Sequence, residues 1–593
     1  MSRAAGRAVA THSGLLLLAV LVLLPTMVGG AWFASHENGR YAALIDHFQS
    51  AFFAGNLYPR WIPDLYGGYG YPIFCFYQPG FFFFSLPFAF LGRYPLYTLY
   101  ATTLLLLYLG ALGAYRLGTV MSDHRTGVFC AAMFLLTPYL WVDLYVRGDL
   151  SELTALLLCP WPLYFLCTIT DRVRACRPVN PVVMGLASSL ALVVISHPAV
   201  ALFYVPVVSV IAAWQGLEVG LRWRYYAPVA LGIVLGLALS APYWFTVFQL
   251  RGEVALERLT LGYYQAVLHV VAPWQLVSRA WGFGSSVPGD KDTMSFQLGL
   301  VHLVLTTVGA IVNRRSRIVQ AAYVVYLALI VFMTPVAAWA WSHVGLLRTV
   351  QFPWRILSVT ASLQILCMAG LGRLSALPVL GRRLGLVFAA LLLMGIGWHH
   401  DQLAISAPLN ATYAMLVHRG ERFTTMENFA NENEYLPRTV RYPEALVPRR
   451  DRIPIVEPFG PAQVEALEGN SPYRISFVVE ASQALDVRIN QIYFPGWRVL
   501  IDGQDVDRAT LERRLPVDGR IVVALTTGRH RLEAFFDGPP GWRVRDGVIV
   551  LALLLFAVRW KNERVRSVPG AESGAAGNGR RRGVASPSTI VQR

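Results

Sequence analysis

The sequence has few charges for its length and almost no lysine. Of its 593 residues only 15% are charged, whereas 55% are hydrophobic and 12% are aromatic. This composition excludes an ordinary soluble protein, and the length excludes a single small domain. We therefore expect a polytopic α-helical membrane protein.

Cysteine is also scarce, and its placement excludes two kinds of small domain. The six cysteines lie mostly in apolar segments, show no metal-ligand spacing and are absent from the polar region after residue 400. Such a pattern indicates neither a disulfide framework nor a structural zinc site. The net charge of +16 comes almost wholly from arginine, which can reflect genome composition, so we expect no nucleic-acid partner.

Apolar stretches long enough to cross a bilayer recur along the chain. A hydrocarbon core about 30 Å thick needs about 20 apolar residues per helix. The first apolar run could belong to a signal peptide, but its length and the lack of a clear cleavage site favour an uncleaved helix. We predict about twelve transmembrane helices, at 13–32, 95–115, 126–143, 153–170, 180–196, 198–214, 226–246, 296–312, 318–341, 354–372, 384–399 and 545–559.

Basic residues indicate the orientation of these helices, because cytoplasmic connections are enriched in arginine and lysine. With Arg3 and Arg7 inside, every connection that should face the cytoplasm is basic. This agreement requires that the apolar stretch 79–92 is a re-entrant or interfacial element, which its short length also favours. We predict a protein of the bacterial inner membrane with both termini in the cytoplasm.

The polar region 400–543 differs from the rest of the chain. Its second half alternates hydrophobic and polar residues as strands do, and it contains Asp-Gly pairs at 502–503 and 518–519 that are typical of hairpin turns. We predict a small extracytoplasmic β-sandwich. The expected organisation is a transmembrane domain at 1–399 with outer loops 33–94 and 247–295, the β domain at 400–543, a last helix at 544–560 and a disordered basic cytoplasmic tail at 561–593.

The first outer loop begins with an amphipathic pattern. Hydrophobic side chains from Tyr41 to Phe52 recur at helical spacing, and Gly55 is a natural stop. We expect this helix to lie on the outer membrane surface with its aromatic side toward the lipid. Glu37 then lies at the membrane boundary, where a carboxylate can reach a lipid phosphate or an acceptor without burial in hydrocarbon. This position suits a general base, and Asp46 is the second candidate.

Aromatic residues, prolines and glycines dominate the following stretch "YPRWIPDLYGGYGYP" at 58–72. Tyrosine and tryptophan can anchor a protein at the membrane interface or stack on sugar rings, and both interpretations stay open. Arg60 can grip a phosphate through two parallel hydrogen bonds or contact lipid headgroups. The candidate groove residues of this loop are His36, Tyr58, Trp61, Asp64, Tyr69, Tyr71 and Tyr77.

Charged residues also gather at other outer turns. Asp149 followed by Glu152 fits a helix-capping arrangement; alternatively, Arg147 binds a phosphate while the two acids bind an acceptor or a metal ion. His197, directly before Pro198, is either structural or part of the groove. Arg348 and Arg355 flank "TVQFPW", where they can clamp an anionic carrier or contact headgroups.

The first loop carries a family resemblance. The stretch "GNLYPRWIPDLYGGYGYPIFCFYQP" (55–79), with the acid just beyond the first helix, resembles the bacterial membrane proteins known as 6-pyruvoyl-tetrahydropterin synthase-related. These proteins in turn resemble GT-C glycosyltransferases, which take sugars from polyprenyl-phosphate carriers. "YVRGDLSE", "QFPWR" and the β-rich end "YFPGWRVLIDG" are similar to segments of the same group and of YfhO-like proteins. The pterin-related name implies no pterin chemistry.

The resemblance implies a site and an activity. Glu37 takes the place of the acidic residue with which GT-C enzymes activate the acceptor or help to hold a metal ion, although many members of the group have aspartate there. The loop has no DxD motif, which favours a lipid-phosphate donor over a nucleotide sugar and leaves a divalent metal ion open. The implied partners are a polyprenyl-phosphate donor, a glycan or lipid acceptor and membrane lipids.

Three functions follow from this sequence. The first is GT-C type transfer of a sugar, with Glu37 or Asp46 as base and Arg60, Arg147, Arg348 and Arg355 as candidates for binding the donor phosphate. In this interpretation the loop 247–295 covers the site and residues 282–292 form its gate. The alternatives are a carrier or flippase of lipid-linked sugars and a noncatalytic envelope-assembly protein. A carrier predicts broken helices and charges inside the spans, and the span centres are nearly free of charge.

Overall fold

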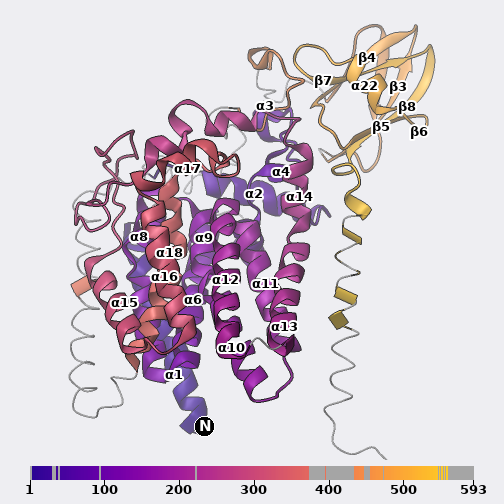
Figure 1. Cartoon of the computed structure of the whole chain (residues 1–593). Coiled ribbons are helices and arrows are strands. Elements are labelled where there is room, and N and C mark those ends of the chain that lie inside the picture. The colour runs from indigo at the N-terminus through magenta and orange to yellow at the C-terminus, as the bar shows by residue number, and fades with distance from the viewer. Residues whose placement is uncertain are drawn as a thin grey trace, which may run out of the picture.

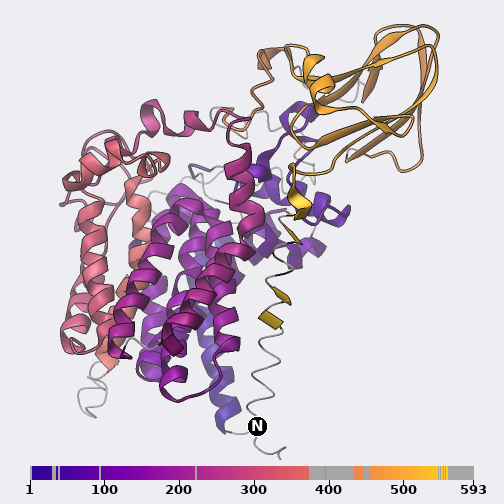
Figure 2. The same cartoon turned by 45° about the vertical axis from the view of Figure 1, so that its right-hand side comes forward.

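The computed structural model shows a bundle of helices with a separate β region at one end (Figure 1). The N-terminus lies at the opposite end of the bundle, as two views show (Figures 1 and 2). The structure describes residues 3–544 except 30–31, 33–34, 38–39, 92–94, 221–222, 373–393, 396–432, 447–454 and 472, and beyond 544 only 546, 547, 549, 551, 553, 554, 556 and 557.

Long apolar helices build the bundle. Five helices of the described chain are long and apolar enough to cross a membrane, or up to eight if each bent pair counts as one span. The principal helices are α1 (Arg3–Gly29), α6 (Pro95–Met121), α7 (His124–Leu135), α9 (Leu150–Leu158), α10 (Pro160–Arg174), α11 (Asn180–Ser196), α12 (Pro198–Glu218), α13 (Trp223–Leu239), α14 (Ala241–Leu250), α15 (Leu300–Val312), α16 (Arg317–Phe332), α17 (Ala338–His343) and α18 (Leu357–Met368).

Three predicted spans are bent rather than straight. The chain turns by 47° between α7 and the segment 138–147, by 57° between α13 and α14, and by 79° between α16 and the segment 335–343. The second limb starts at or next to a proline in each case: Pro138, Pro242 and Pro335. Proline lacks the N–H that would continue the first helix and is tolerated in the first turn of the next one, so each break follows from the sequence.

The predicted count of twelve spans is not supported. The helices α11 and α15 have only 17 and 13 residues, below the length of a full span. The apolar stretch 79–92 forms α5 (Gly80–Ser85) and the short η1 (Leu86–Leu91), which agrees with an element that does not cross. The predicted spans 384–399 and 545–559, apart from a few residues, and the tail 561–593 lie outside the described residues.

Basic connections between helices meet at the end of the bundle that holds the N-terminus. Arg174, at the end of α10, donates to Glu218 Oε1 over 2.6 Å, and the backbone N–H of Arg317 donates to Glu218 Oε2 over 3.2 Å. Three connections that the sequence assigns to the cytoplasmic side therefore lie together.

The first loop forms α2 (Arg40–Phe53), as predicted, and the helix ends just before Gly55, whose φ is +98°. Its hydrophobic face, however, packs on protein. The helix contacts α5 and α6, Tyr41 stacks on Phe82 with 5.7 Å between ring centroids, and Phe48 meets Phe74 at 4.9 Å. The prediction of a surface helix with its aromatic side in lipid is therefore wrong, because the phenylalanines that follow in the chain fold back to cover that side.

The β region contains two antiparallel sheets. One has the order β1 (Val456–Pro458), β4 (Leu485–Ile492), β7 (Arg520–Leu525), and the other has the order β2 (Ala462–Ala466), β3 (Arg474–Ala481), β8 (Gly528–Phe536), β5 (Trp497–Ile501), β6 (Gln504–Asp505). Asp502–Gly503 closes the predicted hairpin between β5 and β6, with φ of +51° and +80°. The second pair, Asp518–Gly519, closes no hairpin but joins α22 (Arg508–Arg513) to β7.

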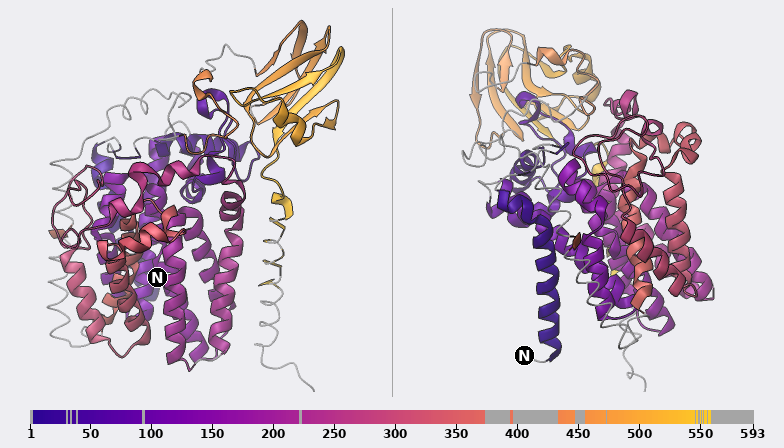
Figure 3. Two further views of the ribbon diagram at one scale, coloured as in Figure 1. Left: turned by 45° about the horizontal axis from the view of Figure 1, so that its top comes forward. Right: turned by 90° about the vertical axis from the view of Figure 1, so that its left-hand side faces the viewer.

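The aromatic stretch of the first loop is the surface on which this β region docks. Trp61 Nε1 donates to Gln491 Oε1 over 3.2 Å, and the Ile492 N–H donates to the Tyr69 carbonyl over 2.7 Å. The Trp61 ring also meets Trp497 at 5.5 Å and lies parallel to Phe536 at 5.6 Å. These rings make a contact within the chain, and Figure 3 shows the β region above the segments coloured as residues 40–90.

The fit at this contact predicts a selective effect of Gly70→Ala. Gly70 has φ of +84°, and an added Cβ would overlap Trp61 and Gln491. Gly55→Ala is the matched control, since Gly55 has φ of +98° but open space around it. Both variants carry the left-handed backbone cost of about 1–2 kcal/mol, and Gly70→Ala adds about 1–3 kcal/mol of overpacking. Thermal unfolding in detergent should give Gly70→Ala the lower Tm by several degrees; equal shifts would show that the contact is loose.

Candidate functional site

The buried charges of the bundle gather at its β-region end. We call Asp143, Arg147, Asp149, Glu152 and Arg355 the charge cluster; the first four lie within one short segment of chain, and Arg355 comes from the start of the last described bundle helix. Four of the five were candidates from the sequence, and the structure brings those four together.

Local backbone geometry creates the segment 143–152. After α8 (Pro138–Trp141) the chain forms a short π-helix, Val142–Arg147. Gly148 then takes φ of +63° and redirects the chain into α9. An added Cβ on Gly148 would overlap Ser35, so glycine also permits the first loop to approach. Asp149 caps α9, because its Oδ1 accepts the Glu152 N–H over 3.0 Å. This confirms the capping interpretation for Asp149.

Arg147 is the centre of the charge cluster. Its guanidinium donates to Asp143 Oδ1 at 2.5 Å, to Glu152 Oε2 at 2.6 Å and to Asp149 Oδ2 at 3.0 Å. Its side chain is only 6% exposed and lies over the Trp354 ring at 4.7 Å. A cation with three carboxylate partners has little capacity left for a phosphate.

Glu152 is fully buried, and both of its carboxylate oxygens have polar partners. Its Oε1 accepts hydrogen bonds from the hydroxyls of Tyr139 at 2.7 Å and Ser358 at 2.9 Å. Its Oε2 meets Arg355 Nε at 3.1 Å in addition to Arg147. Glu152 therefore does not complete a capping box with its own helix; it ties α8, α9 and α18 together.

The charges of the cluster do not balance. Three carboxylates face two guanidiniums, and Asp143 Oδ2 is a buried oxygen with no hydrogen-bond partner among the described residues. Burying an uncompensated charge costs several kcal/mol. Asp143 is the carboxyl group that the cluster can most readily keep protonated, since only one of its oxygens is engaged.

His197 lies beside the cluster as a neutral imidazole. Its Nε2 is 3.9 Å from both Asp149 Oδ2 and Glu152 Oε2. Burial lowers the pKa of His197 to about 4, against the opposing effect of Glu152, so the ring is uncharged at neutral pH. Its Nδ1 accepts the N–H of Val200 at 3.2 Å and caps α12, which confirms the structural interpretation and assigns the ring proton to Nε2.

The trio Asp149, Glu152 and His197 offers ligand atoms within 4.8 Å of one another, the spacing of a metal site. Its donors, however, do not fit a resident metal ion. Both carboxylates already pair with Arg147 and Arg355, and coordination through His197 Nε2 would require moving the proton onto the nitrogen that caps α12. In this arrangement the guanidiniums take the place that a cation would occupy.

Glu37 and His36 lie against the cluster through the backbone. The N–H of His36 donates to the Val146 carbonyl at 3.1 Å, and the N–H of Glu37 donates to the Arg147 carbonyl at 3.0 Å. The loop 247–295 reaches the same place, since His36 Nε2 lies 3.1 Å from the Gly284 carbonyl. Three segments therefore meet here: the first loop, the segment 143–152 and the loop 247–295. This agrees with the prediction that all three lie on the same side of the membrane.

Glu37 keeps access to solvent at this junction. Its carboxylate pairs with Arg40 at 2.7 Å, and its side chain remains 23% exposed. Burial raises the pKa of Glu37, and the charge of Asp149 adds to this; Arg40, Arg147 and Arg355 act in the opposite direction. The pKa of Asp149 shifts in the other direction. Burial alone would raise this pKa, but Arg147, His197 and Arg355 hold it well below its usual range.

Two tyrosines extend the polar network toward the first loop. The Tyr77 hydroxyl donates to the Tyr41 hydroxyl at 3.0 Å, and Tyr41 donates to Asp149 Oδ1 at 3.1 Å while it accepts the Ser151 N–H at 2.8 Å. Tyr77 thus reaches the cluster, but as a buried link in a hydrogen-bond chain.

The remaining candidates lie elsewhere. Asp46 is half-buried in α2 and forms no ion pair among the described residues. Arg60 stacks on Tyr58 at 4.0 Å and donates to the Pro242 carbonyl at 3.4 Å, so both residues pack against α14. Asp64 and Arg348 are exposed. Trp61, Tyr69 and Tyr71 are buried at the docking surface of the β region, since the Tyr71 hydroxyl accepts the Tyr435 N–H at 3.2 Å.

The segment 282–292, expected to be a gate, is tied down by Asp292. The carboxylate of Asp292 accepts the Gln275 side-chain amide and the Val287 N–H, both at 2.8 Å. Nearby, the Trp354 indole donates to Ser286 Oγ at 3.3 Å, which fixes this segment over the cluster.

Sequence reasoning missed Asp143, Tyr139 and Ser358. Asp143 had a signal, because an acid four residues before Arg147 at the end of an apolar stretch can pair with it on one helical face. The hydroxyls of Tyr139 and Ser358 had none, since their common partner depends on how α8 and α18 pack. Comparison with protein-family models, curated proteins and solved structures finds no match to this chain.

The ion pairs predict a large loss of stability for Arg147→Gln and a small change for Asp143→Asn. Removing Arg147 leaves three buried carboxylates with one cation, which should cost about 3–5 kcal/mol. Asp143→Asn replaces the carboxyl group that the cluster can keep neutral by a neutral amide of the same size, and should change stability by about 1 kcal/mol or less. Arg174→Gln, which breaks an exposed pair with Glu218, is the control and should also cost under about 1 kcal/mol. Thermal unfolding in detergent tests the ranking; a larger loss in Asp143→Asn than in Arg147→Gln would contradict this account.

The ion pairs of Asp149 and Glu152 also predict that chelators do not change the stability of the protein. Because Arg147 and Arg355 already pair with Asp149 and Glu152, EDTA treatment should leave the Tm within about 1 °C, and added Mg²⁺ or Mn²⁺ should not raise it. Stabilisation by a metal ion grows with its concentration relative to Kd, so a titrating rise in Tm would show a metal site. That rise should disappear in His197→Gln if the trio is its location.

Proposed function

We propose that this chain is a membrane glycosyltransferase of the GT-C type, which moves a sugar from a polyprenyl-phosphate donor to a glycan or lipid acceptor of the cell envelope. In this proposal the β-region end faces the outer side of the bacterial inner membrane and the N-terminus faces the cytoplasm. One observation carries it: Glu37, whose side chain is partly exposed and whose pKa is raised by burial, is held by a hydrogen bond from its backbone N–H to the Arg147 carbonyl of the buried charge cluster.

The position of Glu37 supports a role as general base. A base works best when its pKa approaches the working pH, and burial moves the pKa of Glu37 in that direction. The residue is open to solvent on one side and fixed to the rigid segment 143–152 on the other. Such a carboxylate can accept a proton from an acceptor hydroxyl without moving its own backbone.

The proposed reaction is a direct group transfer. The acceptor oxygen forms a bond to the anomeric carbon as its proton passes to Glu37. The bond between that carbon and the phosphate oxygen breaks, and its electron pair leaves with the phosphate. The proton is then released from Glu37 to water. Phosphate is a good leaving group, so positioning and charge stabilisation supply most of the rate enhancement.

Arg355 is the arginine best placed to stabilise the leaving phosphate. It is 14% exposed, against 6% for Arg147, and its contacts to Glu152 and Asp149 are 3.1 and 3.7 Å. Arg147 then acts as a positioning residue that fixes the Glu37 backbone and the acids. Arg60 and Arg348 have no described contact with the cluster, so the proposal no longer assigns them to the donor phosphate.

A carrier of lipid-linked sugars is the second candidate. The three bent helix pairs and the buried Asp143, Arg147 and Glu152 at the ends of predicted spans favour it, because carriers bind substrates at broken helices. The positions of the breaks favour the transferase. In Figure 1, α14 and α17 lie toward the β-region end of the bundle, whereas a carrier site is expected near the bilayer midplane.

Glu37→Gln is the variant that tests the transferase. Removing a general base lowers a rate by about 10²–10⁴-fold, so cells that carry Glu37→Gln should match cells without the protein. Both should lose one sugar from an envelope glycan or lipid and accumulate the polyprenyl-linked donor. Mass spectrometry of both fractions measures this, with equal membrane levels of all variants.

Asp46→Asn is the matched control, because it neutralises the rival acid of the same loop. It should behave as wild type. If Asp46→Asn loses the sugar while Glu37→Gln does not, the base is Asp46. If neither variant differs from wild type while the deletion does, the carrier is the better description.

A further inference from the structure

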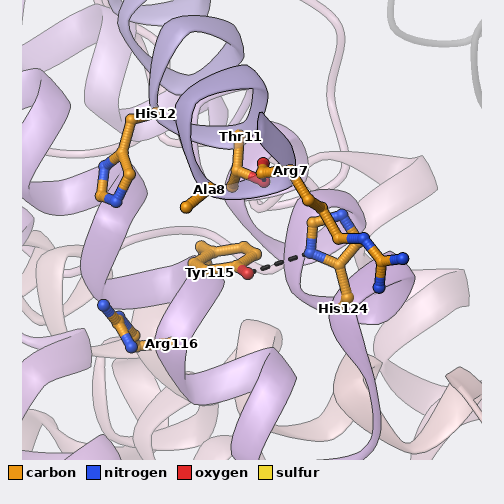
Figure 4. A pocket seen from close by; sticks show the side chains of 7 residues that line it. All are labelled: Arg7, Ala8, Thr11, His12, Tyr115, Arg116 and His124. Atoms are coloured by element: carbon orange, nitrogen blue, oxygen red, sulfur yellow. Dashed lines mark hydrogen bonds between the residues drawn. The ribbon is translucent and has the colours of Figure 1, made fainter. Parts of the chain in front are cut away.

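A second polar site lies at the opposite end of the bundle from the charge cluster. A cavity of 390 Å³ opens between the first turns of α1, the end of α6 and the start of α7. Figure 4 shows the seven lining side chains, with Arg7 and His124 on one side of the Tyr115 ring, His12 and Arg116 on the other, and Ala8 and Thr11 from the first turns of α1. We call it the basic pocket.

The basic pocket has cationic groups and no acid in its lining. Arg7 and Arg116 form no ion pair within the described part of the chain, in contrast to Arg147 and Arg355 in the charge cluster. The nearest acid along the chain, Asp123, uses its carboxylate to cap α7 through Thr126 at 2.8 Å. Two guanidiniums that line one cavity without a counter-charge favour an anion in that cavity.

The histidines add donors to the same space. His124 Nδ1 lies 2.9 Å from the Tyr115 hydroxyl, and His12 Nδ1 lies 2.6 Å from the Tyr108 hydroxyl. When Nδ1 accepts from tyrosine, the ring proton is on Nε2, which leaves one N–H donor on each imidazole. The lining of the pocket can therefore supply N–H donors from imidazoles as well as from guanidiniums.

The depth of the pocket fits a lipid headgroup. Arg7 is four residues from the start of α1 and Arg116 is five residues from the end of α6, which places both about 7 Å inside the helix ends. Both helices pass the criteria for membrane spans, so this level is the headgroup region of the leaflet at the N-terminal end. Basic pockets between helices at this level are suited to anionic headgroups.

We propose that the basic pocket binds the phosphate group of an anionic lipid, held by Arg7 and Arg116 with the histidines as further donors. The same chemistry would accept a free phosphate compound, and the experiment separates the two sources. The inference does not depend on the proposed transferase activity, because the two sites lie at opposite ends of the bundle.

The test is a titration of the full-length protein in detergent with dioleoyl phosphatidylglycerol, followed by native mass spectrometry. Each arginine near a lipid phosphate contributes about 1 kcal/mol, so Arg7→Gln combined with Arg116→Gln should weaken the tightest binding step about 30-fold. Phosphatidylcholine should bind at least tenfold more weakly than phosphatidylglycerol to the wild type.

The matched control is Arg314→Gln combined with Arg315→Gln, which removes the same charge from two exposed arginines of the α15–α16 connection. This control should bind as the wild type does. Competition by inorganic phosphate or glycerol phosphate at micromolar concentration would identify a soluble phosphate compound as the ligand of the pocket; no competition would identify the lipid.

Two results would overturn the proposal. The first is equal affinity of the pocket variant and the wild type, or an equal loss in the control variant. The second is wild-type binding of phosphatidylcholine as tight as that of phosphatidylglycerol, a measurement that does not depend on the folding of any variant.

Discussion

The ion pairs of Arg147 are the interaction on which the β-region end of the bundle depends. A guanidinium held at 2.5–3.0 Å from three carboxylates is stable in a buried place only while all of its partners stay in position. Those partners lie on the π-helix before α9, at the N-cap of α9 and on α9 itself. Glu152 also accepts hydrogen bonds from α8 and α18. The cluster therefore fixes the helix ends against each other, and Glu37 obtains its place from the same arrangement because its N–H binds the Arg147 carbonyl.

Each end of the bundle solves the problem of charge at a membrane boundary differently. At the β-region end, three carboxyl groups and two arginines pair with one another inside the protein. At the N-terminal end, Arg7 and Arg116 line a cavity that has no acid in its lining, and we propose that an anion from outside the protein binds there. The contrast follows from where each segment lies: an internal ion pair needs several helix ends to converge, whereas a headgroup can meet an arginine at any helix end that reaches the interface.

Much of this structure follows from the sequence, and the misses have physical causes. The helical bundle, the separate β region, the stop at Gly55 and the cap at Asp149 rest on local patterns that tertiary packing did not override. The count of twelve spans is not supported, because α11 and α15 are short and because two of the predicted spans lie mostly outside the described residues. The aromatic residues of the first loop were assigned to lipid or ligand, since an amphipathic face gives no sign of what covers it. Arg147 and Glu152 were found from the sequence, but their mutual pairing depends on a turn around Gly148 that no pattern showed.

The docking contact between Trp61 and Gln491 joins residues 430 positions apart in the chain. Chains emerge from the ribosome at about 5–20 residues per second, so Trp61 is made about 20–90 s before its partner Gln491 exists. Until then the Trp61 ring lacks its contacts with Trp497 and Phe536. A chain that stopped before residue 491 would therefore lack the partner of Trp61, and the ring would lose its contacts with Trp497 and Phe536.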